Sequence, residues 1–340
     1  MSLIRLSSSA FVRNLSLLRD RAANAKIAAV LKDNAYGHGL SEMAALCAQN
    51  GVKHAIVRNR DEAKAIAPLF DEVLILADEP SDDAPQNVSF ALNDERAASV
   101  WASKTRVHLK IDGGMHRNGV APNAIERTVE TLWERGLILR GVFSHLRSAD
   151  VLSTEFFWQE KNFALMRERI VALCDRRAMP RPLFHLRASA GAFRAKTSES
   201  YDLIRSGIAL YGYCDLDFPF EKPPLKPVLS LWAHRIARRE LTPRDRVGYG
   251  GVFETPSDLR AGIYDIGYGD GFLRLNGLEG YKTPEGKRLL GRVSMDNMAI
   301  EGDDEFICVL DDAQKLAKLR ATISYEVLAR LSANIKREIV

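Results

Sequence analysis

The chain has 340 residues, of which 46% are hydrophobic and 27% charged, a composition typical of a globular protein large enough for two domains. No apolar run approaches the roughly 20 residues that span a bilayer, and Arg5, Arg13, Arg19 and Arg21 interrupt any signal-peptide core, so we expect a cytoplasmic protein. The net charge of +4 is weak, and no basic stripe with interleaved aromatic residues suggests a nucleic-acid partner.

The first two thirds of the chain alternate between short apolar runs and amphipathic stretches. Phe11, Leu15 and Leu18 recur at helical spacing and predict a first helix. Eight strands are predicted at 27–32, 54–57, 73–76, 88–92, 107–112, 141–145, 183–187 and 202–205. Helical patterns lie between most of them, at 41–50, 123–135 and 153–177, with Ser41 as N-cap of the first and Gly51 just past its end. This order predicts a parallel (β/α)8 barrel of the TIM type, with a doubly wound sheet as the alternative.

The spacing between the third and fourth strands is short, so at least one crossover helix should be reduced. A proline-rich break follows at 219–227, which is incompatible with continuing helix or central strand. Beyond it, strand-like segments at 246–253, 262–268 and 289–300 precede a final helix near 325–332. We therefore expect a barrel domain over 1–222 and a smaller, mainly β domain over 223–340.

The four cysteines are far apart and form no C-x-x-C pair, which predicts buried thiols rather than a disulfide framework or structural zinc. They are Cys47, Cys174, Cys214 and Cys308. No metal site is expected.

Polar side chains end several of the predicted strands, where the chemistry of a (β/α)8 barrel is located. They are Lys32, Lys110 with Asp112, His145, His185 and Arg205. So many cations suit an anionic ligand. Lys32 follows the apolar residues 28–31, and a desolvated lysine has a lowered pKa and a nucleophilic amine, as Schiff-base chemistry requires. On the residues alone, a strand-end lysine that reaches solvent is the competing interpretation.

The segment AVLKDNAYGHG at 29–39 resembles the cofactor-lysine segment of alanine racemases, in which Tyr-Gly-His-Gly follows the lysine after three residues. Eight more segments resemble the same family in the same order. They are KIDGGMHRNGV at 110–120, GVFSHLRSAD at 141–150, HLRAS at 185–189, IRSGIALYG at 204–212, VGYGGVF at 247–253, IGYGDGFLR at 266–274, GRVSMD at 291–296 and TISYEVL at 322–328.

The resemblance implies a pyridoxal-phosphate enzyme that interconverts L- and D-alanine and supplies D-alanine for peptidoglycan. It implies a barrel that binds the cofactor, a β domain, and a head-to-tail homodimer whose active sites each combine the barrel of one chain with the β domain of the other. Lys32 would hold pyridoxal 5'-phosphate as a Schiff base and act as the base for D-alanine. Tyr249 would act on the opposite face for L-alanine; a phenol, with an ordinary pKa of ~10, needs nearby cations to favour its ionised form.

The resemblance also assigns the cofactor's surroundings. Arg205 would face the pyridine nitrogen; because guanidinium keeps its protons, the ring stays a weaker electron sink. His185 would orient Arg205, and His145 would link Tyr249 to the cofactor region. The phosphate would be held by Tyr36, Ser189, the amides of Gly207 and Ile208, and Tyr325.

The remaining implied residues surround the substrate. Arg117 would support its carboxylate, and Met295 would touch it through the backbone. Tyr268 and Asp296 would line the entrance from the partner chain. Lys110 matches a lysine that is carbamylated in many relatives, and we predict the same modification beside Arg117.

Several positions depart from the family pattern. Asp33 replaces a small residue, Gly113 a threonine, Ser206 a proline and Ser294 a cysteine, while Arg187-Ala188 stand where relatives have Ala-Asn. The missing amide at 188 puts the hydrogen bonding beside the cofactor in doubt. None of these positions is Lys32, Tyr249 or Arg205.

Three other functions compete. A racemase of broader specificity would accept serine, lysine or arginine. A non-catalytic pyridoxal-phosphate homeostasis protein is a single-domain barrel, so Tyr249, Met295-Asp296 and the β domain argue against it. A decarboxylase of the same fold type places an acidic residue at the pyridine nitrogen, where Arg205 stands here.

Overall fold

The computed structural model describes residues 1–195, 201–277 and 279–340 and forms two compact units. The barrel unit comprises Val12–Asp33 and Met43–Leu225, and the sheet unit comprises Met1–Phe11, Asn34–Glu42 and Lys226–Val340.

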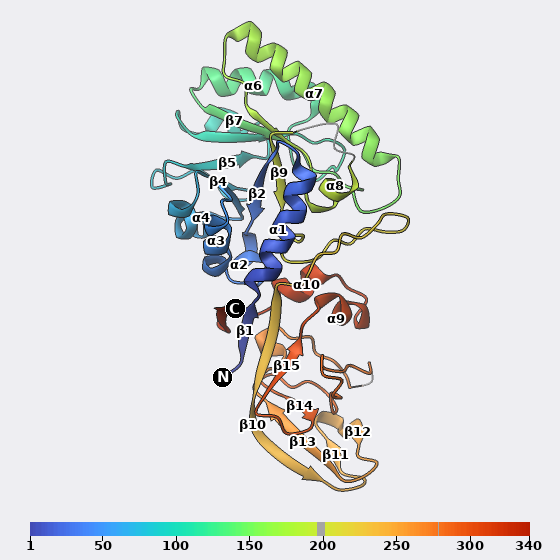
Figure 1. Ribbon diagram of the computed structural model, residues 1–340. Helices are drawn as coiled ribbons and strands as arrows, with labels where there is room; N and C mark the ends of the chain where they lie inside the picture. The colour runs from blue at the N-terminus through green and yellow to red at the C-terminus, as the bar shows by residue number, and fades with distance from the viewer. Residues whose placement is uncertain (196–200, 278) are drawn as a thin grey trace. The chain divides into compact units, whose positions relative to one another are not determined.

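Eight parallel strands form the barrel unit (Figure 1). They are β2 (Lys26–Val30), β3 (His54–Val57), β4 (Glu72–Ile75), β5 (Val88–Leu92), β6 (Arg106–Lys110), β7 (Ile138–Phe143), β8 (Leu183–His185) and β9 (Leu203–Ser206). Their order is β8-β7-β6-β5-β4-β3-β2-β9, and a parallel bridge between Ala188 and Arg205 brings the two edge strands together. The predicted TIM-like barrel is confirmed, and the alternative doubly wound sheet is wrong.

Helices follow most of the strands. They are α1 (Ser8–Ala22), α2 (Lys32–Tyr36), α3 (Leu40–Gln49), α4 (Arg60–Ile66), α5 (Ala97–Val100), α6 (Ile125–Glu134), α7 (Glu155–Arg177) and α8 (Ser189–Arg194). Single 3-10 turns occur at Ala67–Leu69 and Pro122–Ala124. Between β4 and β5, where every residue is described, there is no helix, which confirms the reduced crossover.

The predictions for α1 and for the start of α3 have different outcomes. The amphipathic first helix is confirmed, since Phe11, Leu15 and Leu18 of α1 are all buried. The assignment of Ser41 as an N-cap is wrong because α3 already begins at Leu40, whose N–H donates to Asn34 Oδ1 at 2.8 Å. A side chain six residues upstream supplies the acceptor that Ser41 was expected to provide.

The barrel strands are buried on both faces, and the core between them and the helices is apolar, as in other parallel sheets covered by helices. Val107 and Leu109 of β6 belong to one buried cluster with Phe163 and Ile170 of α7. Figure 1 shows α6 and α7 side by side, and Arg169 of α7 donates two hydrogen bonds of 2.6 Å to Glu126 of α6.

The sheet unit is built on β1 (Leu3–Leu6), β10 (Leu229–Leu241), β13 (Leu259–Tyr264), β14 (Met298–Glu301), β15 (Phe306–Leu310) and β16 (Lys336–Ile339). Their order is β14-β13-β10-β1-β16, with β15 also on β10. A small hairpin pairs β11 (Arg246–Val247) with β12 (Phe253–Glu254), 3-10 turns cover Tyr249–Gly251 and Tyr268–Asp270, and two helices follow, α9 (Ala313–Leu319) and α10 (Ser324–Ala329). The predicted mainly β character is confirmed, whereas β1, β10, β15 and β16 were not predicted.

The four cysteines are buried and form no disulfide, as predicted. Among the described residues, no helix combines the length and apolarity that crossing a membrane requires.

Candidate active site

The backbone directly after β2 adopts a strained conformation. The predicted strand 27–32 ends at Val30, and Lys32 begins the short turn α2. Asp33, Asn34, Ala35 and Tyr36 then have φ values of 54°, 53°, 51° and 53°, so α2 is a left-handed turn. This conformation costs roughly 1–2 kcal/mol per residue for L-amino acids. Strain of this kind is retained mainly at functional sites.

Lys32 stands in a polar rather than an apolar setting. Its Nζ lies 3.7 Å from Asp33 Oδ2, and its side chain is 37% exposed. Asp33 Oδ1 in turn accepts a hydrogen bond of 3.1 Å from Arg58. The expectation that a dry, apolar strand end surrounds this amine is therefore wrong for the single chain.

Arg205 of β9 is held in place by several hydrogen bonds. Its guanidinium is buried and donates to the carbonyls of His185, Ser144 and Leu186 at 2.8, 2.7 and 3.0 Å. It also lies 3.1 Å from His185 Nδ1 and 3.4 Å from His145 Nδ1. Burial lowers the pKa of Arg205 to about 9, so the side chain is still a cation at neutral pH.

A buried chain of hydrogen bonds continues from Arg205 through the barrel interior. His185 Nε2 lies 2.9 Å from His108 Nδ1, and His108 Nε2 lies 3.1 Å from Glu72 Oε1. Because arginine has no acceptor, His185 must accept at Nδ1, donate from Nε2 to His108, and leave His108 to donate from its own Nε2 to Glu72. We call this series of hydrogen-bonded side chains, Arg205–His185–His108–Glu72, the relay.

Glu72 ends the relay as a buried carboxylate. It also accepts from Ser89 Oγ at 2.7 Å and lies 3.2 Å from both Arg106 and Arg140. Although burial raises it, the hydrogen bonds from His108 and Ser89 and the charge of Arg106 hold the pKa of Glu72 well below its usual range. His185 is kept neutral because burial, Arg205 and the other histidines lower its pKa well below its usual value.

Sequence reasoning missed His108 and Glu72. The available signal was a polar residue inside an apolar strand, since His108 stands between Val107 and Leu109 and Glu72 precedes Val73. Neither is at the carboxyl end of its strand, where the chemistry of a (β/α)8 barrel is expected.

Positive side chains gather around His145, just beyond β7. Burial, followed by the charges of four cations, lowers the pKa of His145 to about 3. Those cations are Arg205, Arg117, Lys110 and Lys32. The barrel mouth therefore brings four predicted site residues together with His145, and their summed charge suits an anionic ligand.

Lys110, at the end of β6, contacts Asn118 Oδ1 and lies 5.8 Å from the centre of the Phe143 ring. Burial, Arg117 and Arg205 together lower the pKa of Lys110 to about 8. The amine is therefore still mostly a cation at neutral pH, but its uncharged form is more accessible than in an ordinary lysine.

Ser189, Gly207 and Ile208 form a buried polar corner after β8 and β9. Ser189 Oγ accepts from the Ala209 amide at 3.3 Å and lies 3.3 Å from Ser206 Oγ. The buried amides of Gly207 and Ile208 donate to no acceptor within the described part of the chain. An external acceptor would satisfy both.

The other predicted residues belong to the sheet unit. Tyr36 and Tyr325 are neighbours there, with ring centres 5.8 Å apart. Tyr249 stands between Gly248 and Gly250, both with positive φ, and is 67% exposed.

The remaining sheet-unit residues lie on two loops that the backbone joins. The Tyr268 amide donates to Ser294 O at 3.0 Å and the Gly269 amide to Met295 O at 2.8 Å. Met295 is 54% exposed, and Asp296 is exposed beside it.

Two departures from the family pattern have local explanations. A Cβ at Gly113 would stand 2.6 Å from Ser144 Oγ, so the serine hydroxyl occupies the space that a larger residue at 113 would need. Arg187 is buried and paired with Glu160 at 2.8 Å, and its guanidinium lies 5.3 Å from the centre of the Tyr201 ring.

Comparison with known proteins agrees with this architecture. The family models of the alanine racemase N-terminal domain and the alanine racemase C-terminal domain match residues 6–215 and 228–339. The alanine racemase of a Nitratiruptor species is 45% identical over 338 residues, which make up 99% of this chain and 99% of that protein. The chain belongs to the alanine racemase family.

Solved structures of this family share the fold. Alanine racemase from E. faecalis has 26% identity and a TM-score of 0.83, covering 100% of this chain and 98% of that one. The enzyme from Bartonella henselae, solved with covalently bound pyridoxal phosphate, has 24% identity and a TM-score of 0.81, covering 100% and 99%. The resemblance predicted from the sequence is thus confirmed, and the chain is an isomerase that acts on amino acids.

Proposed function

We propose that this protein interconverts L- and D-alanine in the cytoplasm and supplies D-alanine for peptidoglycan, using pyridoxal 5'-phosphate bound to Lys32. The observation that carries the proposal is the cationic barrel mouth, in which Arg205 is held rigidly and four cations surround His145. The alanine racemases that match the chain over its full length support alanine as the substrate.

The residues of the barrel mouth fit this cofactor. The amides of Gly207 and Ile208 are buried donors in need of acceptors, and phosphate oxygens are strong acceptors. Ser189 lies beside them. The resemblance adds the hydroxyls of Tyr36 and Tyr325 to the phosphate and places His145 and His185 around the ring.

When bound, pyridoxal 5'-phosphate withdraws electrons from the amino-acid Cα and so acidifies its C–H bond. Arg205 would limit that withdrawal, because a guanidinium does not release a proton to the pyridine nitrogen. Its orientation is set by three carbonyls and by His185, which cannot turn without breaking the relay. The position of Arg205 would thus determine how strongly the pyridine ring withdraws electrons from the substrate.

Lys32 and Tyr249 are the proposed acid–base pair, one on each face of the substrate. Lys32 Nζ would move the proton of the D-enantiomer and Tyr249 Oη that of the L-enantiomer. Arg117 and the backbone of Met295 would hold the carboxylate, while Tyr268 and Asp296 would line the entrance.

We propose that Tyr249 acts in the partner subunit of a homodimer. Large exposure in the single chain, 67% for Tyr249 and 54% for Met295, fits residues that complete a second chain's site. A mixed dimer of a Lys32→Ala chain and a Tyr249→Phe chain, isolated with two different tags, should then show about half the wild-type kcat, because one of its two sites is intact.

The reciprocal dimer is the control. Wild type paired with a chain carrying both substitutions has two broken sites in this arrangement and should be inactive. If that dimer retains half the activity while the first has none, Tyr249 acts within its own chain.

The activity is tested directly by incubating the purified protein with L-alanine and separating the enantiomers by chiral chromatography. Absence of D-alanine from protein with cofactor bound would refute the proposal. Tyr249→Phe should keep the yellow, borohydride-reducible adduct but lose at least about a hundredfold in turnover. Full activity in that variant would refute the two-base assignment.

We also propose that Lys110 is carbamylated. The uncharged amine attacks carbon dioxide, forms an N–C bond and releases one proton, which leaves an anion near Arg117. The lowered pKa of Lys110, about 8, favours this reaction. With carbon-13-labelled bicarbonate, a carbamate NMR signal that disappears in Lys110→Gln is expected, and an unmodified amine would refute the modification.

A further inference from the structure

A cavity of about 380 Å3 opens at the amino end of the barrel. It is lined where β2, β3, β7 and β8 begin, by Lys26, His54, Ile138 and Leu183. The proposed active-site residues follow the carboxyl ends of the strands, so this cavity belongs to the opposite end of the barrel.

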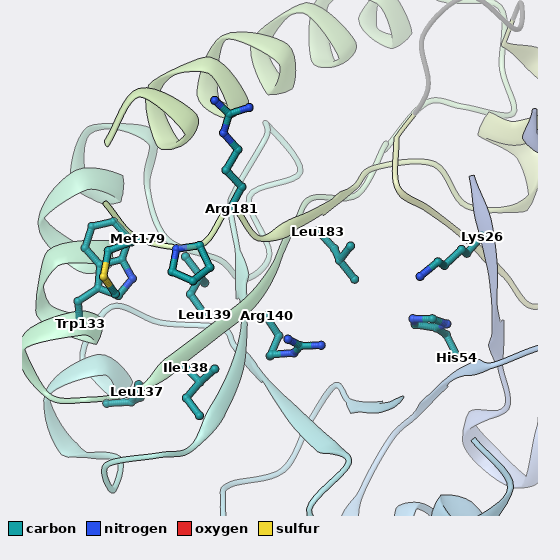
Figure 2. A pocket seen from close by; sticks show the side chains of 11 residues that line it. Lys26, His54, Trp133, Leu137, Ile138, Leu139, Arg140, Met179, Arg181 and Leu183 are labelled. Atoms are coloured by element: carbon teal, nitrogen blue, oxygen red, sulfur yellow. The ribbon is translucent and has the colours of Figure 1, made fainter. Parts of the chain in front are cut away.

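Basic side chains meet on one wall of the cavity. Figure 2 shows the nitrogen atoms of Lys26, His54 and Arg140 directed toward the same space. Lys26 is exposed and makes no ion pair within the described residues. His54 is only 9% exposed, and its Nδ1 and Arg140 Nε are buried without a hydrogen-bond partner in the described structure.

Glu72 pairs with Arg140 but leaves Lys26 and His54 without an ion pair among the described residues. Glu72 already accepts from Ser89 and His108 and pairs with Arg106 and Arg140. None of the described residues that line the cavity is acidic. A buried guanidinium N–H without an acceptor is unfavourable, and an anionic oxygen would accept from Arg140 Nε–H and, in the tautomer protonated at Nδ1, from His54.

The opposite wall is apolar. It is formed by Trp133, Leu137, Leu139, Met179 and Leu183. Figure 2 shows Trp133 and Met179 together at the far side of the cavity from Lys26 and His54. A ligand that spans both walls must carry its charge at one end and an apolar body at the other.

We propose that this cavity binds a small organic carboxylate with an apolar body, about the size of a benzoate. The carboxylate lies between Lys26, His54 and Arg140, and the body rests on Trp133 and Met179. Binding at this end of the barrel is independent of the proposed racemisation and persists when alanine saturates the active site.

The probe is 4-(trifluoromethyl)benzoate, observed by fluorine-19 NMR with the holoenzyme in saturating alanine. We expect saturable binding that Lys26→Gln weakens about fivefold or more, because it removes one cation from the carboxylate. Since Lys26 is exposed, this variant leaves the fold intact. The neutral 4-(trifluoromethyl)benzamide should bind at least about fivefold more weakly than the acid.

Arg181→Gln is the matched control. Arg181 also lines the cavity, but its guanidinium points away in Figure 2 and is bound to Asp175 through two hydrogen bonds of 3.0 and 2.8 Å. Its loss should change the affinity less than about twofold. Unchanged affinity in Lys26→Gln, equal binding of the amide, or no saturable binding by about 10 mM would each overturn the proposal.

Discussion

Glu72→Gln tests whether a buried charge far from the barrel mouth stabilises the barrel and holds Arg205. The glutamine keeps the shape of the carboxylate but removes its charge from Ser89, His108, Arg106 and Arg140. Each hydrogen bond to a charged group contributes about 1.5–3 kcal/mol, but Arg106 and Arg140 reach solvent and regain hydration, so we expect a net loss of about 3 kcal/mol. In a unit of about 200 residues, this corresponds to a Tm lower by about 6–12 °C.

The pH dependence of the Tm difference between Glu72→Gln and the wild type distinguishes the effect of the lost charge from the effect of the changed side chain. The pKa of Glu72 is depressed in the folded protein, so its contribution is complete above the ordinary glutamate value of ~4.3 and is lost as pH falls through the lower folded value. Thermal unfolding of both proteins from pH 7.5 down to pH 2.5 should show the full deficit from neutrality down to about pH 4.5 and a clearly smaller one at pH 2.5. Glu126→Gln, which removes a carboxylate from the exposed pair with Arg169, should lower Tm by less than about 2 °C.

The relay adds a functional consequence. With a neutral acceptor at its end, His108 orients His185 less strictly, and we expect kcat to fall about tenfold with KM changed less than twofold. Glu72→Asp, which keeps the charge, should recover part of kcat. If Glu72→Gln has the wild-type Tm at pH 7.5, or if its deficit is the same at pH 2.5 and pH 7.5, the assigned role of the charge is wrong.

Two further predictions concern other buried positions. His38 is fully buried, and burial lowers its pKa to about 4. Unfolding between pH 6.5 and pH 4 therefore takes up a proton at His38, which should lower the free energy of unfolding of the wild type by about 3 kcal/mol across that window. His38→Gln should flatten this pH dependence when the free energy of unfolding is measured by denaturant titration. A Cβ at Gly141 would stand 2.3 Å from His108 Nδ1, so Gly141→Ala should displace that ring. We expect the free energy of unfolding, measured by thermal unfolding, to fall by about 1–3 kcal/mol, and kcat to fall as well. A wild-type free energy of unfolding together with a wild-type kcat would contradict the close packing.

The barrel and the residues at its mouth could be predicted because they follow a simple rule. Parallel strands buried on both faces appear as short apolar runs, and polar residues at their carboxyl ends converge at one edge. Lys110, His145 and Arg205 were found in this way, and electrostatic coupling to His145 places them together.

The sheet unit was harder to predict because its strands are shared between distant parts of the chain. β1 pairs with β10 and β16, more than 200 residues away, and the residues of β1 alone carry no sign of these partners. The far half of β10 exposes Arg238, Arg239 and Glu240, so its apolar alternation stops before the strand does. Local pattern cannot reveal an element whose stability comes from pairing.

The left-handed turn after Lys32 also could not be predicted from local sequence pattern. Asp33 and Asn34 tolerate positive φ, but Ala35 and Tyr36 do not favour it, and no propensity predicts such a run of left-handed residues. Several hydrogen bonds within the sheet unit hold the segment, including Asn34 Oδ1 to the Leu40 amide at 2.8 Å and Gly37 O to Arg337 at 2.9 Å. Backbone strain that is stabilised by surrounding hydrogen bonds is evidence of a functional constraint. Here the strained residues directly follow Lys32, the proposed cofactor lysine, in the chain.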